Sequence, residues 1–395
     1  MSTTDIYQND QFTLYATHAS EDQLYIAGRN EDPGADPSDV CMEIYNQILK
    51  VLKKSEMQIV QERLFGSNSL YQTILDTRNR ALVEHEISND LPLTYIQGHP
   101  CWGTGFAGVQ MQAILPEDPE KDVWTIYDGK VPVGRGWRQN GTKFIMLHNI
   151  HGLNDHNSGD RSEQTSRMFA HADQLLKTQN ASFSNVVRTW IYLSDILDWY
   201  GDFNKVRNEK FREFGLFTNG NAQSEAEDIY MPASTGIEGN NPMGASGIMD
   251  ALAVLRGPDS SVQIMQTFGT EQKSPYRYGS AFSRAMTIQD PKTKHIYLSG
   301  TASIDEKGNS VHIGDVRAQI IKTLEVVEAL IAEEGATLHD ICKTTVFLKH
   351  PEDMNVYNEV ISEYGLSELP SVCVVADVCR EELLFELDAI VVMIR

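Results

Sequence analysis

The feature that most constrains the fold is an internal repeat. Residues 181–194 and 336–349 match in residue type at nearly every position. Each segment follows a stretch, 167–178 or 316–334, whose apolar residues recur at three and four spacing and so predict an amphipathic helix. Because self-similarity of this kind is typical of tandem structural units, we expect one unit of strand, helix, strand and helix to recur along the chain.

A fainter third copy occupies the front of the chain. Its expected strands and helices lie at 24–28, 42–54, 59–65 and 70–83. The sequence therefore predicts an α+β protein of three tandem units that form a single-chain pseudo-trimer. The expected divisions are an N-terminal extension at 1–20, a degenerate unit at 21–122, a second unit at 135–256 and a C-terminal unit at 277–395, with linkers at 116–122 and 257–275.

The last expected strand carries chemically active side chains. Cys379, Arg380 and Glu386 stand beside the apolar runs 383–385 and 390–394, which favour a buried strand. An ionised Glu386 would be costly there without a partner, so burial favours the protonated acid. This stretch alone supports two interpretations equally: a catalytic acid, or a structural ion pair of Glu386 with Arg380 or another arginine.

The three copies differ at the position of Glu386. Aligning Cys101 with Cys379 places Gly108 there, and aligning the segments around 249–252 and 387–390 places Ile248 there. An ion pair that the fold required should recur in every copy. The asymmetry therefore favours a function for Glu386, in one of three equivalent clefts between units.

Composition and net charge limit the classes of molecule that the protein is expected to bind. The chain has 395 residues, 41% of them hydrophobic, and a net charge of −22, which disfavours nucleic acid and anionic membranes. We expect a small anionic substrate, which would need a local cluster of arginines in a cleft. Five scattered cysteines without a CxxC pair predict reduced thiols in a cytoplasmic protein. No stretch is long and apolar enough to cross a membrane.

The repeated unit resembles the Rid-type enamine/imine deaminase fold, a chorismate-mutase-like α+β unit, and the two later units together resemble the chorismatase family. Several ordered motifs carry the resemblance across most of residues 140 to 395. They are 188–193, 197–200, 203–204, Arg207, 232–237, 282–285, 299–305 and 379–386.

This resemblance implies hydrolysis of chorismate to pyruvate and either a cyclohexadiene diol carboxylate or a hydroxybenzoate, without metal or organic cofactor. It implies that Glu386 is the acid and that the C-terminal unit is catalytic. A cysteine at the position of Cys379 is associated with the hydroxybenzoate-forming branch. The resemblance also places Ala302 and Gly236 in the substrate pocket, where Ala302 would help to set the product.

The chemistry of such a substrate selects further candidates. An enol ether is cleaved after protonation of its terminal carbon, and two carboxylates need charge-assisted partners such as arginine. Arg380 is the first candidate, followed by Arg284, Arg188 and Arg207. Arg188 matches Lys343 in the repeat, so a surface or inter-unit role competes with ligand contact as its interpretation. Arg207 has a competing interpretation as a solvated helix charge.

Two further residues have more than one possible role. Tyr192 would donate a hydrogen bond to a substrate hydroxyl, or it belongs to the core, since Phe347 occupies the matching place. Cys379 has no neighbouring histidine in sequence, so we interpret it as setting the shape or polarity of the pocket rather than as a nucleophile.

Two other motifs are not expected to be sites. A polar loop holds the possible metal ligands His148, His151, Asp155, His156 and Asp160 but lacks a helical ligand framework, so we predict no metal site. The glycine-rich run 103–108 lacks the lysine and the helix of a phosphate-binding loop.

The leading hypothesis is a chorismatase-like hydrolase, a monomer built as a pseudo-trimer or a weak homo-oligomer. One alternative is a Rid-type deaminase of enamines or imines, or another hydrolase of small acids. A second alternative is a non-catalytic protein that binds small anions, because two of the three units lack the acid.

Overall fold

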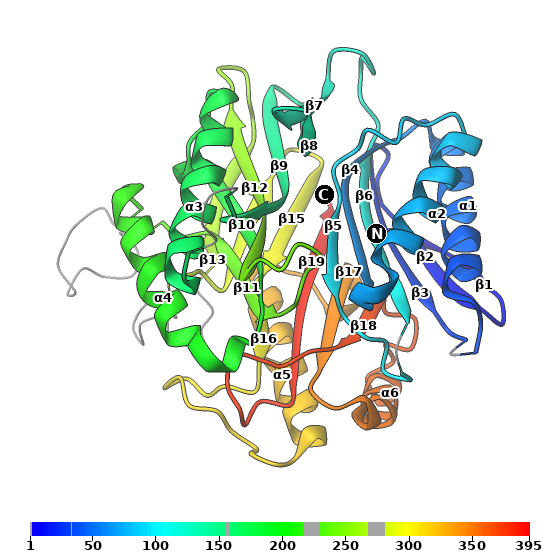
Figure 1. Ribbon diagram of the computed structural model, residues 1–395, viewed down its shortest axis with the longest axis vertical. Coiled ribbons are helices and arrows are strands. Elements are labelled where there is room, and N and C mark those ends of the chain that lie inside the picture. The colour runs from blue at the N-terminus through cyan, green and yellow to red at the C-terminus, as the bar shows by residue number, and fades with distance from the viewer. Residues whose placement is uncertain (1, 33, 104, 155–158, 217–229, 268–280) are drawn as a thin grey trace.

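The structure is a computed structural model of the chain, and it describes residues 2–32, 34–103, 105–154, 159–216, 230–267 and 281–395. Three β-sheets face one another at the centre, and a pair of helices covers the outer side of each sheet (Figure 1). The prediction of an α+β protein made of three tandem units is therefore confirmed.

Each sheet is built from one stretch of the chain. The first has the order β1-β2-β3-β6-β4-β5, from β1 (Thr3–Gln8), β2 (Phe12–Ser20), β3 (Gln23–Asn30), β4 (Gln58–Gly66), β5 (Thr94–Gln97) and β6 (Phe106–Ile114). The second has the order β11-β10-β12-β9-β8-β7, from β7 (Val123–Asp128), β8 (Val131–Gln139), β9 (Thr142–His151), β10 (Val186–Leu193), β11 (Ala233–Glu238) and β12 (Gly247–Arg256). The third has the order β13-β14-β15-β19-β17-β18 with β16 paired to β19, from β13 (Gln263–Thr267), β14 (Ala285–Gln289), β15 (Thr293–Leu298), β16 (Thr301–Ala302), β17 (Ile341–Leu348), β18 (Ser371–Val375) and β19 (Phe385–Ile394).

The helices follow the same repeat. They are α1 (Pro37–Ser55) and α2 (Tyr71–Glu84), α3 (Arg161–Thr178) and α4 (Ile196–Glu213), and α5 (Val316–Ala332) and α6 (Met354–Glu363). The first helix of every unit begins after an aspartate whose side chain accepts a backbone N–H: Asp36, Asp160 and Asp315. Such a cap satisfies one of the free donors at a helix start, so it fixes where the helix begins.

The repeated segments fold alike in detail. Short 3₁₀ turns at Phe183–Asn185 and Leu338–Asp340 precede β10 and β17, and reciprocal capping boxes close both turns, between Ser182 and Asn185 and between Thr337 and Asp340. These polar pairs make residues 181–194 and 336–349 recognisable as copies of one unit.

The sheets extend beyond the expected divisions. β1 and β2 lie within residues 1–20, expected as an extension, and β13 lies within 257–275, expected as a linker. β7 and the start of β8 precede residue 135, where the second unit was expected to begin. The residues of β1 are mostly polar and exposed, so they lack the alternation of apolar and polar residues that marks a strand in sequence.

Strand register aligns the three units. In the third sheet Glu386 pairs with Phe347, in the second Ile248 pairs with Tyr192, and in the first Gly108 pairs with Phe65. The neighbouring pairs continue in step along each sheet, so Glu386, Ile248 and Gly108 occupy one structural position, as the sequence alignment predicts.

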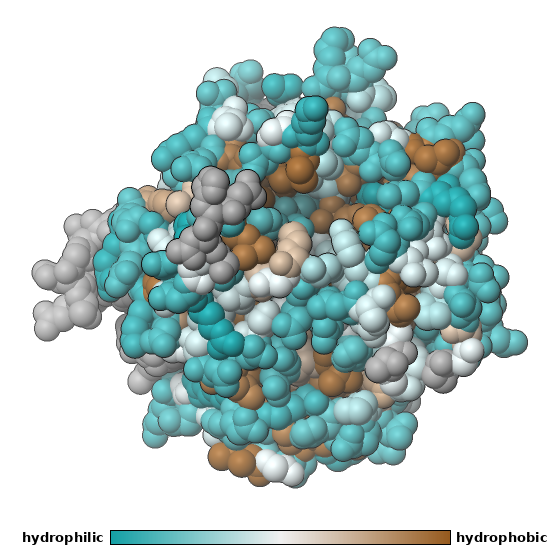
Figure 2. Space-filling view, viewed as in Figure 1, coloured by the Kyte–Doolittle hydropathy of each residue, from teal (hydrophilic) through white to brown (hydrophobic). Residues whose placement is uncertain are grey.

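The apolar interior divides in the same way. One cluster of buried side chains lies between the three sheets, and three others lie between a sheet and its own helices. The face shown in Figure 2 is mainly hydrophilic, with hydrophobic side chains in small separate groups. No helix among the described residues is long and apolar enough to cross a membrane.

Candidate active site

A cavity opens between the second and third units. The space inside it that admits the centre of a water-sized sphere is about 50 Å³, so it is a small cavity. From the second unit it is lined by Tyr200, Arg207, Ser234 and Gly236, and from the third by Phe282, Arg284, Gly300, Ala302, Ile304, Cys379, Arg380 and Glu386.

Hydrogen bonds hold the two walls together. The backbone N–H of Ser234 on β11 donates to Oγ of Ser299 at 2.8 Å, and the N–H of Gly300 donates to the carbonyl of Ser234 at 3.2 Å. The hydroxyl of Ser299 donates in turn to the carbonyl of Ser283 at 2.6 Å. These bonds fix the turn after β15 against the edge of the second sheet.

Glu386 lies near the start of β19, between β16 and β17, and is 5% exposed. Its carboxyl fits against Gly300, where any Cβ would collide with Oε1. Burial, and to a lesser extent the charge of Asp388, raise the pKa of Glu386 to about 8 against the opposing effect of Arg188. At neutral pH Glu386 is therefore a protonated acid that faces the cavity.

Three guanidinium groups share this cavity. Cζ of Arg207 lies 5.3 Å from the ring centroid of Phe203 and 5.8 Å from that of Phe282, and Cζ of Arg284 lies 5.8 Å from the Phe282 ring. Arg380 donates to the carbonyl of Gly308 at 2.9 Å and to the hydroxyl of Ser310 at 3.2 Å, both neutral acceptors. The cavity is therefore suited to an anion.

Arg207 adds a specific requirement. The side chain is 1% exposed, and its Nη2 donates to Oδ1 of Asn204 at 2.6 Å. Its Nε has no hydrogen-bond partner among the described residues. Because an unsatisfied buried donor is costly, Arg207 favours an acceptor within the cavity.

Cys379 lines the cavity as a half-buried residue. Burial and the neighbouring Glu386 raise the pKa of its thiol to about 12. Since the thiolate is the nucleophilic form, this environment disfavours covalent catalysis and suits a residue that shapes the pocket.

Seven of the nine candidate residues from the sequence line this cavity: Glu386, Cys379, Arg380, Arg284, Arg207, Ala302 and Gly236. Arg188 and Tyr192 do not. Arg188 is buried against Asp388, and the hydroxyl of Tyr192 is buried without a hydrogen-bond partner in the described part of the chain. Both belong to β10, where alternate residues turn toward the space between the three sheets.

Five lining residues had no role in the sequence-based prediction: Tyr200, Ser234, Phe282, Gly300 and Ile304. All five lie within the motifs that carry the family resemblance, which was the available signal. The distance between Gly300 and the carboxyl group of Glu386 could not be predicted from the sequence.

The two equivalent clefts lack this constellation. Between the first and second units Ile248 replaces the acid and Tyr95 occupies the register position of Gly236. Between the third and first units the acid is replaced by Gly108, where a Cβ would collide with the carbonyl of Gly28. Among the described residues, only the cleft with Glu386 has a carboxyl group at this register position together with guanidinium groups in the lining.

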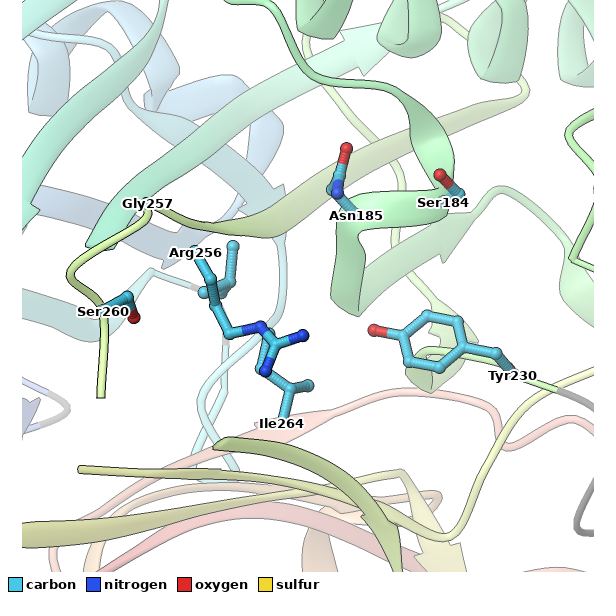
Figure 3. A pocket seen from close by; sticks show the side chains of 8 residues that line it. Ser184, Asn185, Tyr230, Arg256, Gly257, Ser260 and Ile264 are labelled. Atoms are coloured by element: carbon cyan, nitrogen blue, oxygen red, sulfur yellow. The ribbon is translucent and has the colours of Figure 1, made fainter. Parts of the chain in front are cut away.

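A second pocket lies between the end of β12 and β13. In Figure 3 the guanidinium of Arg256 and the hydroxyl of Tyr230 point toward each other across it. The described lining is Ser184, Asn185, Tyr230, Val254, Arg256, Gly257, Ser260 and Ile264. This lining offers no carboxyl, thiol or imidazole group, so it is not suited to acid catalysis.

The other two motifs take structural positions. His148 is buried, which lowers its pKa to about 4, and Asp160 caps α3; Asp155 and His156 lie outside the described residues. The described residues hold no cluster of three metal-ligating side chains. The glycine-rich run leads into the strand β6, which begins within it at Phe106.

The raised pKa of Glu386 predicts a pH-dependent cost in stability. Between pH 4.5 and about 8 the folded protein keeps a proton that the unfolded chain has released, so stability falls as pH rises through this window. The slope is at most about 1.4 kcal/mol per pH unit. Glu386→Gln should therefore gain stability relative to the wild type from pH 5 to pH 8 in urea unfolding. A stability difference that is constant with pH would contradict the assignment.

Comparison with known proteins places the chain in a family. Residues 151–225 and 276–393 match the family described as Endoribonuclease L-PSP. A RutC family protein of Pyrococcus abyssi is 32% identical over 120 residues, which cover 30% of this chain and 91% of that protein.

Chorismatases match a longer stretch. The chorismatase of Streptomyces rapamycinicus is 27% identical over 230 residues, which cover 53% of this chain and 64% of that protein, so the match spans less than two thirds of this relative. A crystal structure of a chorismatase superimposes with a TM-score of 0.59 at 19% identity over 84% of this chain and 92% of that one. These matches confirm the resemblance predicted from the sequence. The chain therefore belongs to the RutC family and has chorismatases among its homologues.

Proposed function

We propose that this chain is a chorismatase-like hydrolase that cleaves the enolpyruvyl ether of chorismate to pyruvate and a ring product. The observation that carries the proposal is a protonated Glu386 facing a cavity that Arg207, Arg284 and Arg380 also line. The chorismatases of two Streptomyces species among the homologues support the choice of substrate.

Glu386 acts as the general acid. Its proton passes to the terminal methylene carbon of the enol ether, whose double-bond electrons form the new C–H bond and leave an oxocarbenium ion. Water adds to this cation and returns a proton to the Glu386 carboxylate. The resulting hemiketal breaks its bond to the ring oxygen, releasing pyruvate and a cyclohexadiene diol carboxylate. A positioned acid of this kind contributes about 10²–10⁴-fold to the rate.

Capture of the cation by a ring hydroxyl instead leads to a hydroxybenzoate. Cys379 and Ala302 border Glu386 in the cavity and would decide between the two fates through the space and polarity that they offer. The guanidinium groups hold the two substrate carboxylates, since the planar fork of arginine binds carboxylate through two parallel hydrogen bonds.

Incubation of the purified protein with chorismate tests this proposal. We expect pyruvate and one ring product in equal amounts, and the identity of that ring product assigns the branch. Absence of pyruvate would overturn the proposal. Tight binding of chorismate without products would instead indicate a small-anion binding protein.

A second candidate is deamination of a small enamine or imine. The protein named 3-aminoacrylate deaminase RutC from Acinetobacter baylyi is 30% identical over 96 residues, which cover 24% of this chain and 76% of that protein. Release of ammonia from 3-aminoacrylate, with no action on chorismate, would favour this candidate.

A further inference from the structure

A buried ion pair joins the second and third units next to Glu386. Oδ2 of Asp388 on β19 accepts hydrogen bonds from Oγ1 of Thr235 at 2.8 Å and from Nη2 of Arg188 at 3.2 Å. Asp388 is 4% exposed and Arg188 is 1% exposed. Such a pair is desolvated, so removing one partner leaves the other charge unpaired in the interior.

Glu386 and Asp388 are alternate residues of one strand, so their side chains lie on the same face about 7 Å apart. The charges of both carboxyl groups act on the guanidinium of Arg188, and that of Asp388 acts more strongly. Arg188 thus has two potential carboxylate partners, and in the structure it binds Asp388.

A similar buried ion pair lies in the neighbouring cleft, where Ile248 takes the place of Glu386. Asp250 accepts hydrogen bonds from Nε of Arg63 at 2.6 Å and from Oγ1 of Thr94 at 2.5 Å. Asp250 faces Trp190 and Asp388 faces Thr345, so the two aspartates occupy equivalent register positions. The residue two places before Asp250 is Ile248. Asp250 therefore joins two units with no glutamate beside it, whereas Asp388 also neighbours Glu386.

Titratable and charged groups from several elements lie around Glu386 and Asp388. They are Arg188 from β10, Lys343 from β17, Tyr200 and Arg207 from α4, Arg284 before β14, Cys379 and Arg380 before β19, and Asp388 from β19. Of these, the charge of Asp388 disfavours ionisation of Glu386 and that of Arg188 favours it.

We propose that Asp388 is a positioning residue that holds Arg188 in an ion pair away from Glu386, so that the acid stays protonated and ready to donate. This inference rests on the proposed role of Glu386 as general acid. Without the charge of Asp388, Arg188 would become an unpaired buried cation, and Glu386 would ionise to neutralise it.

The test measures the protonation of Glu386 directly and without substrate. The carboxyl band of Glu386 is followed by infrared difference spectroscopy against the Glu386→Gln protein as pH is raised. In Asp388→Asn we expect the titration midpoint to fall by about one pH unit or more, at least tenfold in proton affinity. The pH profile of kcat/KM for chorismate should move in the same direction.

Two variants separate this effect from a general loss of packing. Asp250→Asn makes the same chemical change in the equivalent cleft and should leave the midpoint of Glu386 unchanged. Arg188→Met/Asp388→Asn removes both charges, so burial alone should restore a high midpoint. Equal midpoints in Asp388→Asn and Asp250→Asn would overturn the proposal.

A further comparison serves if Asp388→Asn does not fold. Arg188→Met/Asp388→Asn is then compared with the wild type: an ion pair held away from Glu386 acts on it little, so the two midpoints should agree to within about half a pH unit. A midpoint more than about one unit higher in the double variant would show that Arg188 acts on Glu386 while paired, and would overturn the proposal. The infrared titration needs no turnover. A shifted midpoint in Asp388→Asn without pyruvate release would therefore discard the proposed reaction alone, and pyruvate release with an unshifted midpoint in Asp388→Asn would discard the role of Asp388 alone.

Discussion

Replacing Glu386 with glutamine should abolish pyruvate release from chorismate while leaving the ligand bound. Glutamine keeps the shape of the side chain, but its amide has no acidic proton to transfer to carbon. Loss of a general acid lowers the rate by about 10²–10⁴-fold. The measurement is pyruvate formation under single-turnover conditions, together with calorimetric binding of chorismate, which should change little because Arg207, Arg284 and Arg380 remain.

A matched control lies on the same segment. Glu381 precedes β19, is exposed, pairs with Lys349 and does not line the cavity. Glu381→Gln makes the same chemical change away from the cavity, so it should keep the wild-type rate. Full activity of Glu386→Gln would remove Glu386 from the mechanism.

Gly300→Ala should impair the same reaction by displacing the carboxyl group of Glu386. Its added Cβ would lie 3.0 Å from Cδ of Glu386 and would collide with Oε1, so the carboxyl must move. A displacement of about 1 Å at a reacting group costs on the order of 10²-fold in rate. We expect a loss of that size in kcat, with the protein still folded as judged by its melting temperature.

Gly201→Ala is the control for this substitution. Gly201 lies in α4 beside Tyr200, and a Cβ there meets nothing within 4 Å. This variant should keep full activity and gain up to about 1 kcal/mol of stability from the better helix former. An unimpaired Gly300→Ala protein would show that the observed position of the Glu386 carboxyl is not needed for catalysis.

Much of the fold could be predicted because similar local sequence patterns occur in all three units. Apolar spacing recurs in the copies, so comparing them located most helices and strands. The aspartates that cap α1, α3 and α5 are a further local signal, which played no part in these predictions. β1 escaped prediction because its exposed polar residues carry no apolar alternation, and only its pairing with β2 makes it a strand.

The site was predictable to a more limited degree. Glu386 stood out because the other copies hold Gly108 and Ile248 at its position. The placements of Arg188 and Tyr192 depend on how the sheets are rotated against one another, which local sequence does not encode. The contacts of Asp388 could not be predicted for the same reason, since its partners Thr235 and Arg188 come from another unit.

Because the cavity lies between two units of one chain, its formation does not depend on protein concentration. In an assembly of separate identical subunits such a cleft exists only while neighbours are bound, and its population follows concentration. Here both walls belong to one chain, so a high effective concentration set by covalent linkage holds them together. The three units also have separate sequences, so each cleft can change independently. A substitution on β19 alters a single cleft, whereas in three identical subunits it would appear in all three.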